Sequence, residues 1–168
     1  NSMYINKNEI SLDNLKKDIN ENEEKFLVEK IDISMIKITP ENISEETEFN
    51  ENFFSKIDEI DDLISNNINI NEISKKFNLE VKTINDYYPG KDSEDLLNEI
   101  YKKRNEKVLE LLDKNDFFLL YEIKNLNKVL PSLNNKEFIK MVRNDLFEKN
   151  KYNIHKDLLT KIQEKKFT

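Results

Sequence analysis

The apolar residues of the chain alternate with polar ones in one segment and recur at helical spacing in others. The alternation is strictest between Lys30 and Thr39, where apolar residues occupy every second position and change parity once. In a strand this pattern places two apolar sets on opposite faces, with Ile31, Ile33 and Met35 on one and Ile36 and Ile38 on the other. Apolar residues on both faces predict a strand that is covered on each side.

Other segments have the three-to-four-residue apolar spacing of amphipathic helices. They span residues 11–24, 47–66, 71–77, 93–104 and 134–167. The polar residues that would cap N-termini in this set are Ser11, Ser93 and Asn134. Thr39 before Pro40 is a further helix-start signature. Because Asn is unfavourable inside helices, the Asn-rich residues 150–153 predict a break in the last helix.

The remaining elements are strands and turns. Residues 106–124 predict a hairpin of two strands around a turn at Lys114–Asp116, and Leu79–Ile84 predicts a further strand. Asp86–Asp92 predicts a turn that contains the single glycine of the chain. A hairpin is not stable alone in water, so helices must cover it.

These elements predict an α+β fold, in which a small mixed or antiparallel sheet of about four strands packs with helices and a long C-terminal helix follows. The length of 168 residues fits one domain. We therefore expect a single module over residues 1–168, with a helical lead-in at 1–26, a core at 27–131 and the C-terminal helix at 134–167.

Composition narrows the classes of partner. The chain is 37% hydrophobic and 36% charged, and its apolar periodicity argues against disorder. The net charge of −7 disfavours nucleic acid and anionic membrane surfaces as main partners. No apolar run approaches the ~20 residues of a membrane helix, and no signal peptide is visible. A membrane anchor upstream of the first residue stays open.

Few residues suggest a reaction. The chain has no cysteine, one histidine and one glycine, so it offers no thiolate nucleophile, no metal-ligand motif and no phosphate-binding glycine loop. We interpret His155 as structural or exposed, because no acidic or histidine partner lies on its helix face at i±4. The sequence predicts no catalytic residue, no metal site and no cofactor.

Two aromatic pairs are the candidates for recognition. Adjacent strand residues point to opposite faces, so one of Phe117 and Phe118 leaves the core face, and either packs under a helix or forms a binding surface. Tyr87 and Tyr88 precede a turn, which favours exposure and recognition of a partner.

Several blocks of the chain resemble one family. Ile70–Val81, I-N-E-I-S-K-K-F-N-L-E-V, resembles the L-x-x-I-A-K-x-x-G-L-x-V block of SurA/PpiD-type periplasmic folding factors, which are parvulin-related peptidyl-prolyl isomerases and chaperones. Val108–Leu111 and Phe117–Ile123 resemble the terminal parvulin strand pair. Leu130-Pro131 ahead of Phe138 resembles the family's P-L-x-E-V-R step into a helix.

The chain departs from this family at its catalytic motifs. Active parvulins carry a strand that reads S-H-I-L, whereas this chain has Ser34-Met35-Ile36, with Met35 at the histidine position. The G-G-x-L-G segment and the second histidine-bearing strand are missing as well. The resemblance therefore implies a parvulin-like fold without isomerase chemistry.

The resemblance also implies a role and a place. It implies a bacterial chaperone-type module, periplasmic or on the periplasmic side of the inner membrane, that binds apolar segments of unfolded or outer-membrane client proteins. We expect the binding residues to be Met35, Tyr87, Tyr88, Phe117 and Phe118. Two alternatives stay open: an active peptidyl-prolyl isomerase with atypical site residues, and an assembly subunit that docks or oligomerises through the C-terminal helix.

Overall fold

The chain folds into two compact units. The computed structural model describes residues 6–90, 93–106 and 109–166. One unit, here called the sheet unit, is the continuous segment 29–128. The other, here called the helical unit, combines both ends of the chain, residues 1–28 and 129–168. The segment that forms the sheet unit is thus inserted between the two halves of the helical unit.

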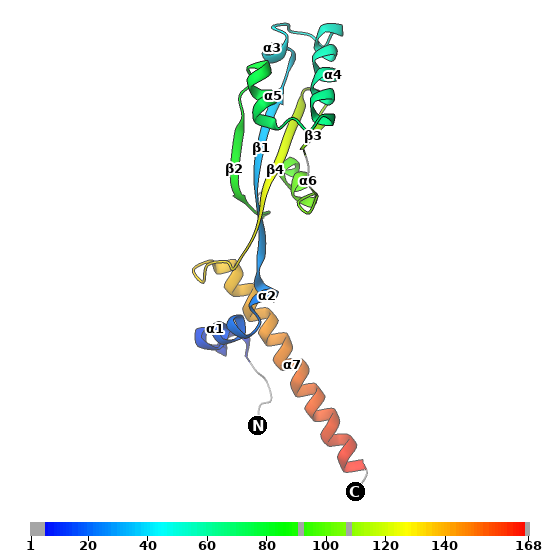
Figure 1. Cartoon of the computed structure of the whole chain (residues 1–168). Helices are drawn as coiled ribbons and strands as arrows, with labels where there is room; N and C mark the ends of the chain where they lie inside the picture. Colours follow the sequence, from blue (N-terminus) through cyan, green and yellow to red (C-terminus); the bar gives the residue numbers. More distant parts are fainter. Residues whose placement is uncertain (1–5, 91–92, 107–108, 167–168) are drawn as a thin grey trace. The chain divides into compact units, whose positions relative to one another are not determined.

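A four-stranded antiparallel sheet forms the centre of the sheet unit (Figure 1). Its strands are β1 (Val28–Ile38), β2 (Lys82–Tyr87), β3 (Leu109–Asp113) and β4 (Phe118–Val129), in the order β2-β1-β4-β3. β3 and β4 form the predicted hairpin, in which Leu111 pairs with Leu120. Asn115, in the turn, has a left-handed backbone with φ 66°. The predicted α+β class, with its hairpin and long C-terminal helix, is confirmed.

Helices cover both faces of this sheet. The helices of the sheet unit are α3 (Pro40–Ile43), α4 (Glu51–Ser65), α5 (Ile70–Phe77) and α6 (Asp95–Lys102). On one face Ile36 and Ile38 pack with residues of α4 and α5, among them Phe53 and Ile73. On the opposite face Ile31, Ile33 and Met35 pack with Leu97 and Ile100 of α6. The predicted division of β1 between two apolar faces is confirmed.

β2 joins β1 through an irregular register. Ile33 pairs with Ile84 and Ile31 with Tyr87, so β2 holds one extra residue between these pairs. Asp86 takes up this extra length with a left-handed backbone, φ 54°. Its backbone N–H donates to the Asp32 carboxylate at 2.9 Å, and the same carboxylate accepts from Asn125 of β4 at 2.8 Å. Asp32 therefore links three neighbouring strands at the bulge.

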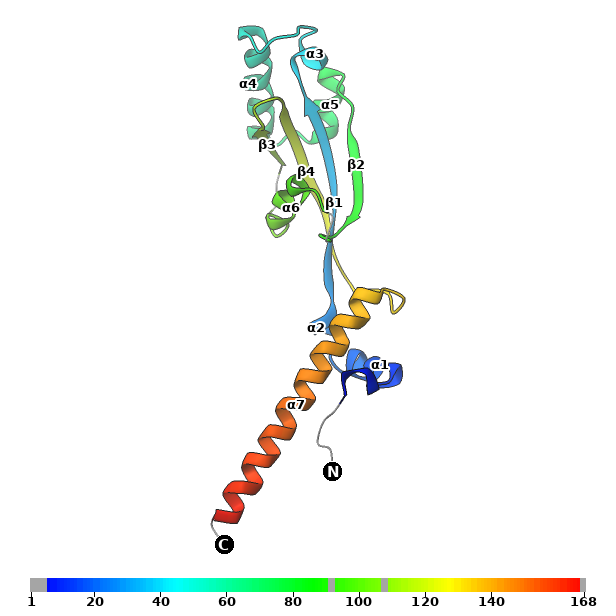
Figure 2. The same cartoon turned by 180° about the vertical axis from the view of Figure 1, so that it is seen from behind.

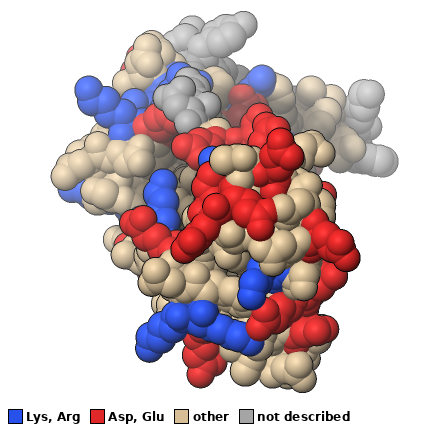
Figure 3. Space-filling model, turned by 90° about the horizontal axis from the view of Figure 1, so that it is seen from above, with Lys and Arg blue, Asp and Glu red and all other residues tan. Residues whose placement is uncertain are grey.

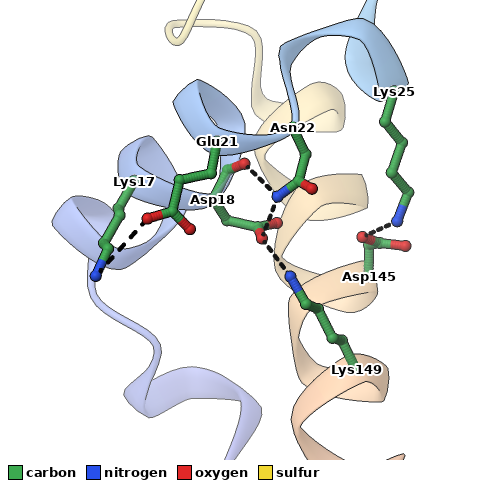
Figure 4. Close-up of polar contacts among 7 residues, drawn as sticks. All are labelled: Lys17, Asp18, Glu21, Asn22, Lys25, Asp145 and Lys149. Carbon is green, nitrogen blue, oxygen red and sulfur yellow. Dashed lines mark hydrogen bonds and ion pairs between the residues drawn. The ribbon is translucent and has the colours of Figure 1, made fainter.

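The helical unit consists of the 3-10 turn η1 (Lys7–Glu9), α1 (Leu12–Glu21), α2 (Glu23–Phe26) and α7 (Lys136–Lys166). Its core contains Leu15, Ile19 and Phe26 from the N-terminal segment and Phe138 and Val142 from α7. Two ion pairs reinforce this contact, from Lys25 to Asp145 at 2.6 Å and from Lys149 to the buried Asp18 at 3.2 Å (Figure 4).

Several predicted boundaries are wrong for local reasons. The strand predicted at 79–84 begins at Lys82, because Leu79 still wraps the end of α5: its N–H and C=O both hydrogen-bond to Ser74. The helix predicted at 11–24 is divided at Asn22, whose φ of −132° is not helical. The last helix is capped by Asn135, not Asn134, and it continues through residues 150–153 without the predicted break.

Smaller differences concern the other helix ends. α4 begins after Asn50, four residues later than the predicted helix start, because the Asn50 side chain accepts from Phe53 N–H at 3.0 Å. α6 has Glu94 rather than Ser93 at its N-cap. The predicted elements also include residues 91–92, 107–108 and 167, which lie outside the described residues. None of the described helices combines the length and apolarity that crossing a membrane requires.

Candidate functional site

An open hollow lies on the α6 face of the sheet unit, beside the start of β2. Its volume is about 670 Å³. The lining residues come from β1, α3, β2 and the residues just before it, α6 and its N-cap, and the β3–β4 hairpin. They are Met35, Lys37, Asn42, Glu80, Val81, Lys82, Glu94, Leu96, Leu97, Phe117 and Leu119.

The lining is divided by depth into apolar and charged parts. Met35, Leu97 and Leu119 are buried, and Val81, Leu96 and Phe117 are half-buried. The exposed lining residues are Lys37, Asn42, Glu80, Lys82 and Glu94. The hollow therefore offers an apolar floor inside a rim that carries charges of both signs. Such a site suits an apolar side chain whose flanking backbone stays in water.

Two of the five predicted binding residues meet in this hollow. Met35 points to the α6 face because of the alternation along β1. Phe117 comes from the hairpin turn, where its C=O accepts from Lys114 N–H at 2.9 Å. The Lys37 ammonium lies 4.7 Å from the centre of the Phe117 ring, a cation–π contact that helps hold the ring beside the floor.

Phe118, the neighbour of Phe117, lies on the other face of the sheet. Its ring centre is 5.8 Å from that of Phe53 in α4, and it packs against the core on that side. Of the two possibilities predicted for this pair, Phe118 packs under a helix and Phe117 lines the hollow.

The two tyrosines are not among the residues that line the hollow. Tyr87 is half-buried, its ring packs edge-on against Tyr101, and its hydroxyl donates to the Asn98 side chain at 3.0 Å. Tyr88 is 51% exposed, as the turn signal predicted. The bulge at Asp86 explains the difference, because the strand prediction ended at residue 84 and left Tyr87 in a turn, whereas Tyr87 pairs with Ile31.

Leu96 and Leu97 were not predicted as site residues. The apolar spacing indicated only that they belong to the amphipathic helix predicted at 93–104. Because they are adjacent, about 100° separates them around the helix, so one can be buried while the other borders an opening. Leu97 is buried and Leu96 is half-buried, as this geometry requires.

A partly buried polar cluster anchors α6 on the sheet. Lys103, at the end of α6, donates to both oxygens of Glu110 in β3 at 2.6 and 2.7 Å. The hydroxyl of Tyr121, a fully buried residue of β4, donates to the same carboxylate. Burial raises the pKa of the Glu110 carboxyl, but the hydrogen bonds from Lys103 and Tyr121 together hold this pKa below its usual range.

The pKa values of Tyr121 and Lys103, the other two members of this cluster, are shifted as well. Burial and the hydrogen bond to Glu110 raise the pKa of Tyr121 above its ordinary value. The hydrogen bond to Glu110 raises the pKa of Lys103. Nearby, Tyr101 donates to the Glu29 C=O at 2.6 Å, and the Arg104 guanidinium lies 4.5 Å from the Tyr101 ring centre and pairs with the Glu29 carboxylate. These contacts fix the position of the helix that carries Leu96 and Leu97.

Acidic side chains dominate the charge of the sheet unit. Residues 29–128 hold 23 Asp and Glu against 14 Lys and Arg, a net charge of −9. Many of the acidic side chains gather at the α3–α4 end, seen from above in Figure 3. Burial, followed by the charges of Asp58 and Asp62, raises the pKa of Asp61. Among the described residues, no group of three or more acidic, histidine or cysteine side chains could hold a metal ion.

No family model, curated protein or solved structure matches the chain in comparisons with known proteins.

Proposed function

We propose that the sheet unit is a non-catalytic, chaperone-type module that binds short apolar segments of unfolded client proteins in the hollow beside Met35 and Phe117. The observation that carries the proposal is the division of the lining into an apolar floor and a charged rim. Burying apolar surface contributes roughly 25 cal/mol per Å². One or two client side chains on a floor of this size would therefore bind weakly and be released readily.

The position of the hollow supports an extended client. β2 is an edge strand, and its first residue Lys82 lines the hollow together with Val81 just before it. A peptide that pairs with the free edge of a strand has every second side chain on one face of the sheet. On the α6 face these side chains would lie along the hollow.

The mixed rim supports selection by apolar character rather than by charge. Lys37 and Lys82 are balanced by Glu80 and Glu94, so neither sign of peptide charge gains a clear advantage. A methionine at position 35, where the resemblance to parvulins places a histidine, supports binding without isomerase chemistry. The relationship to SurA/PpiD-type factors and the periplasmic location remain parts of this proposal.

The two adjacent phenylalanines provide a matched test. A fluorescent peptide with alternating leucine and serine residues is titrated with the full chain, and its anisotropy is measured. We expect Phe117→Ala to weaken binding several-fold with little loss of stability, because Phe117 is half-buried at the hollow. Phe118→Ala should leave the affinity unchanged but lower the free energy of unfolding, since Phe118 packs on Phe53.

Equal effects of the two substitutions on peptide affinity would contradict the assignment of the hollow. A peptide in which aspartate replaces each leucine should not bind. The isomerase alternative is tested separately with a protease-coupled assay on a proline peptide. A rate enhancement that disappears on substitution of Met35 would show that the module is an enzyme.

A further inference from the structure

The C-terminal half of α7 has an apolar side that no described element of the helical unit covers. Tyr152, Leu159 and Ile162 are 67%, 61% and 52% exposed. In two opposite views the helix continues past α1 with no other element of its unit alongside (Figures 1 and 2). This surface is independent of the hollow in the sheet unit.

The apolar residues of α7 change sides along the helix. Phe138, Val142 and Leu146 recur every four residues and pack against the N-terminal segment. The next apolar set begins at Tyr152, six residues after Leu146, and at 3.6 residues per turn its centre lies on roughly the opposite side of the helix. Its members are Tyr152, Ile154, Leu158, Leu159 and Ile162, which together span an arc of about 160°.

Lysines lie at both boundaries of this arc and within it. Lys156 lies just beyond one boundary and Lys161 just beyond the other, whereas Lys151 lies inside the arc, one turn before Ile154. Asp157 and Glu164 lie near the centre of the opposite, polar side. Lysines at the boundaries can extend their ammonium groups toward anionic groups while their methylene stems border the apolar arc.

Three of the described lysines in this half of α7 have no ion-pair partner, unlike the lysines at the core of the helical unit. Lys25 and Lys149 pair with Asp145 and Asp18 within the helical unit (Figure 4). Lys151, Lys156 and Lys161 form no ion pair with any described residue. Residues 149–166 contain six lysines and two acidic residues, a local net charge of +4 in a chain of −7.

We propose that the C-terminal half of α7 binds the surface of an anionic membrane, with its apolar arc in the interface and the ammonium groups of Lys151, Lys156 and Lys161 on the lipid phosphates. A wide apolar arc bordered by lysines is typical of helices that lie in the membrane plane. The net charge of the whole chain disfavoured an anionic surface as a partner. That total is dominated by the sheet unit, which carries −9, and so does not reflect the positive charge of this segment.

The charge pattern disfavours a second copy of the chain as the occupant. A helical dimer through this arc would place boundary lysines of one copy next to those of the other in either orientation, and like charges at these positions oppose pairing. Nucleic acid would satisfy the lysines but would leave the apolar arc without a role. An anionic lipid surface satisfies both features.

The test uses the full chain and vesicles made of equal parts phosphatidylglycerol and phosphatidylcholine, with pure phosphatidylcholine for comparison. Binding is measured by vesicle flotation at rising salt concentration. We expect binding to the anionic vesicles that weakens with salt. A variant with Lys151, Lys156 and Lys161 changed to Gln should bind about fivefold more weakly for each lysine, or roughly 100-fold in total.

Two control variants separate charge from apolar contact. Changing the exposed Lys16, Lys75 and Lys102 to Gln alters the total charge equally and should leave binding nearly unchanged. Leu159→Asp should abolish binding although all lysines remain. Circular dichroism checks that each variant keeps its helix content.

Three results would overturn the proposal. The first is no preference of the full chain for anionic vesicles. The second is equal loss of binding in the two lysine variants, and the third is retained binding in Leu159→Asp, which would indicate charge attraction alone. Concentration-dependent mass in the absence of lipid, abolished by Leu159→Asp, would instead identify a second copy as the occupant.

Discussion

Replacing Tyr121 by phenylalanine removes a single oxygen from the interior of the sheet unit. The Tyr121 side chain is fully buried, and its hydroxyl donates to the Glu110 carboxylate. A hydrogen bond to a charged group contributes about 1.5–3 kcal/mol to stability. The Glu110 side chain keeps 33% of its exposure and retains Lys103, so water can replace part of the lost contact. We therefore expect Tyr121→Phe to lower the free energy of unfolding by about 1.5 kcal/mol, near the lower limit of that range.

The loss should depend on pH with a defined sign. The folded-state pKa of Glu110 lies below its ordinary value of 4.5, so its ionised contacts stabilise the fold above that pH and are lost as the pH falls through the folded value. Removing the hydroxyl raises this folded pKa toward the ordinary one. The difference between wild type and Tyr121→Phe should therefore be largest near neutral pH and shrink below about pH 4.5.

Urea unfolding at several pH values measures this difference. Near-ultraviolet circular dichroism follows mainly the sheet unit, since four of the six tyrosines, Tyr87, Tyr88, Tyr101 and Tyr121, belong to it. Tyr101→Phe is the matched control, because its hydroxyl donates to a backbone carbonyl, which does not titrate. We expect that control to cost about 1 kcal/mol at every pH. A Tyr121→Phe loss that stays constant from neutral to acid pH would refute the role assigned to Glu110.

Two further predictions concern the backbone of the sheet unit. Asp32→Ala should lower the free energy of unfolding by about 1–2 kcal/mol and speed hydrogen exchange of the Asp86 amide. The hydrogen bonds from Asn125 and the Asp86 N–H lower the pKa of Asp32 from 3.8. The stability deficit should therefore be present above pH 3.8 and vanish as the pH falls below it. Asn78 ends α5 with φ 52°, so Asn78→Gly should be more stable than Asn78→Ala by about 1 kcal/mol in urea unfolding.

The parts of the fold that depend on strict periodicity could be predicted from the sequence. A strand covered on both faces needs apolar residues on both, and the change of parity between Met35 and Ile36 was sufficient to assign each residue to its core. The same alternation predicted that Phe117 and Phe118 point to opposite faces of the sheet. These predictions succeed because side-chain direction in a strand follows from position alone.

The parts that depend on contacts distant in sequence could not be predicted. Lys25 and Asp145 are 120 positions apart, and nothing local indicates that the two ends of the chain form one unit. The hollow combines Met35 with Leu96 and Phe117, which tertiary packing alone brings together. For α7, the apolar spacing was interpreted as one amphipathic segment over residues 134–167. The gap between Leu146 and Tyr152 turns the second half of that segment to another side.

Element lengths explain why α6 covers only part of its face of the sheet. β1 has 11 residues and therefore extends about 36 Å, at roughly 3.3 Å per residue. α6 has 8 residues and covers only about 12 Å, at 1.5 Å per residue. The opposite face has α4 with 15 residues in addition to α5 with 8.

A single short helix leaves part of the α6 face uncovered, and the anchor of Lys103 on Glu110 determines which part. This anchor holds the C-terminal end of α6 against the hairpin, so its N-terminal end, with Leu96, borders the open area near Met35 and Lys37. The hollow therefore depends on the Glu110 cluster, although no member of the cluster lines it. Tyr121→Phe should then weaken peptide binding less than Phe117→Ala does, whereas Lys103→Met, which frees the end of α6, should weaken it as much or more. Unchanged peptide affinity in folded Lys103→Met would show that the hollow is set by the sheet alone.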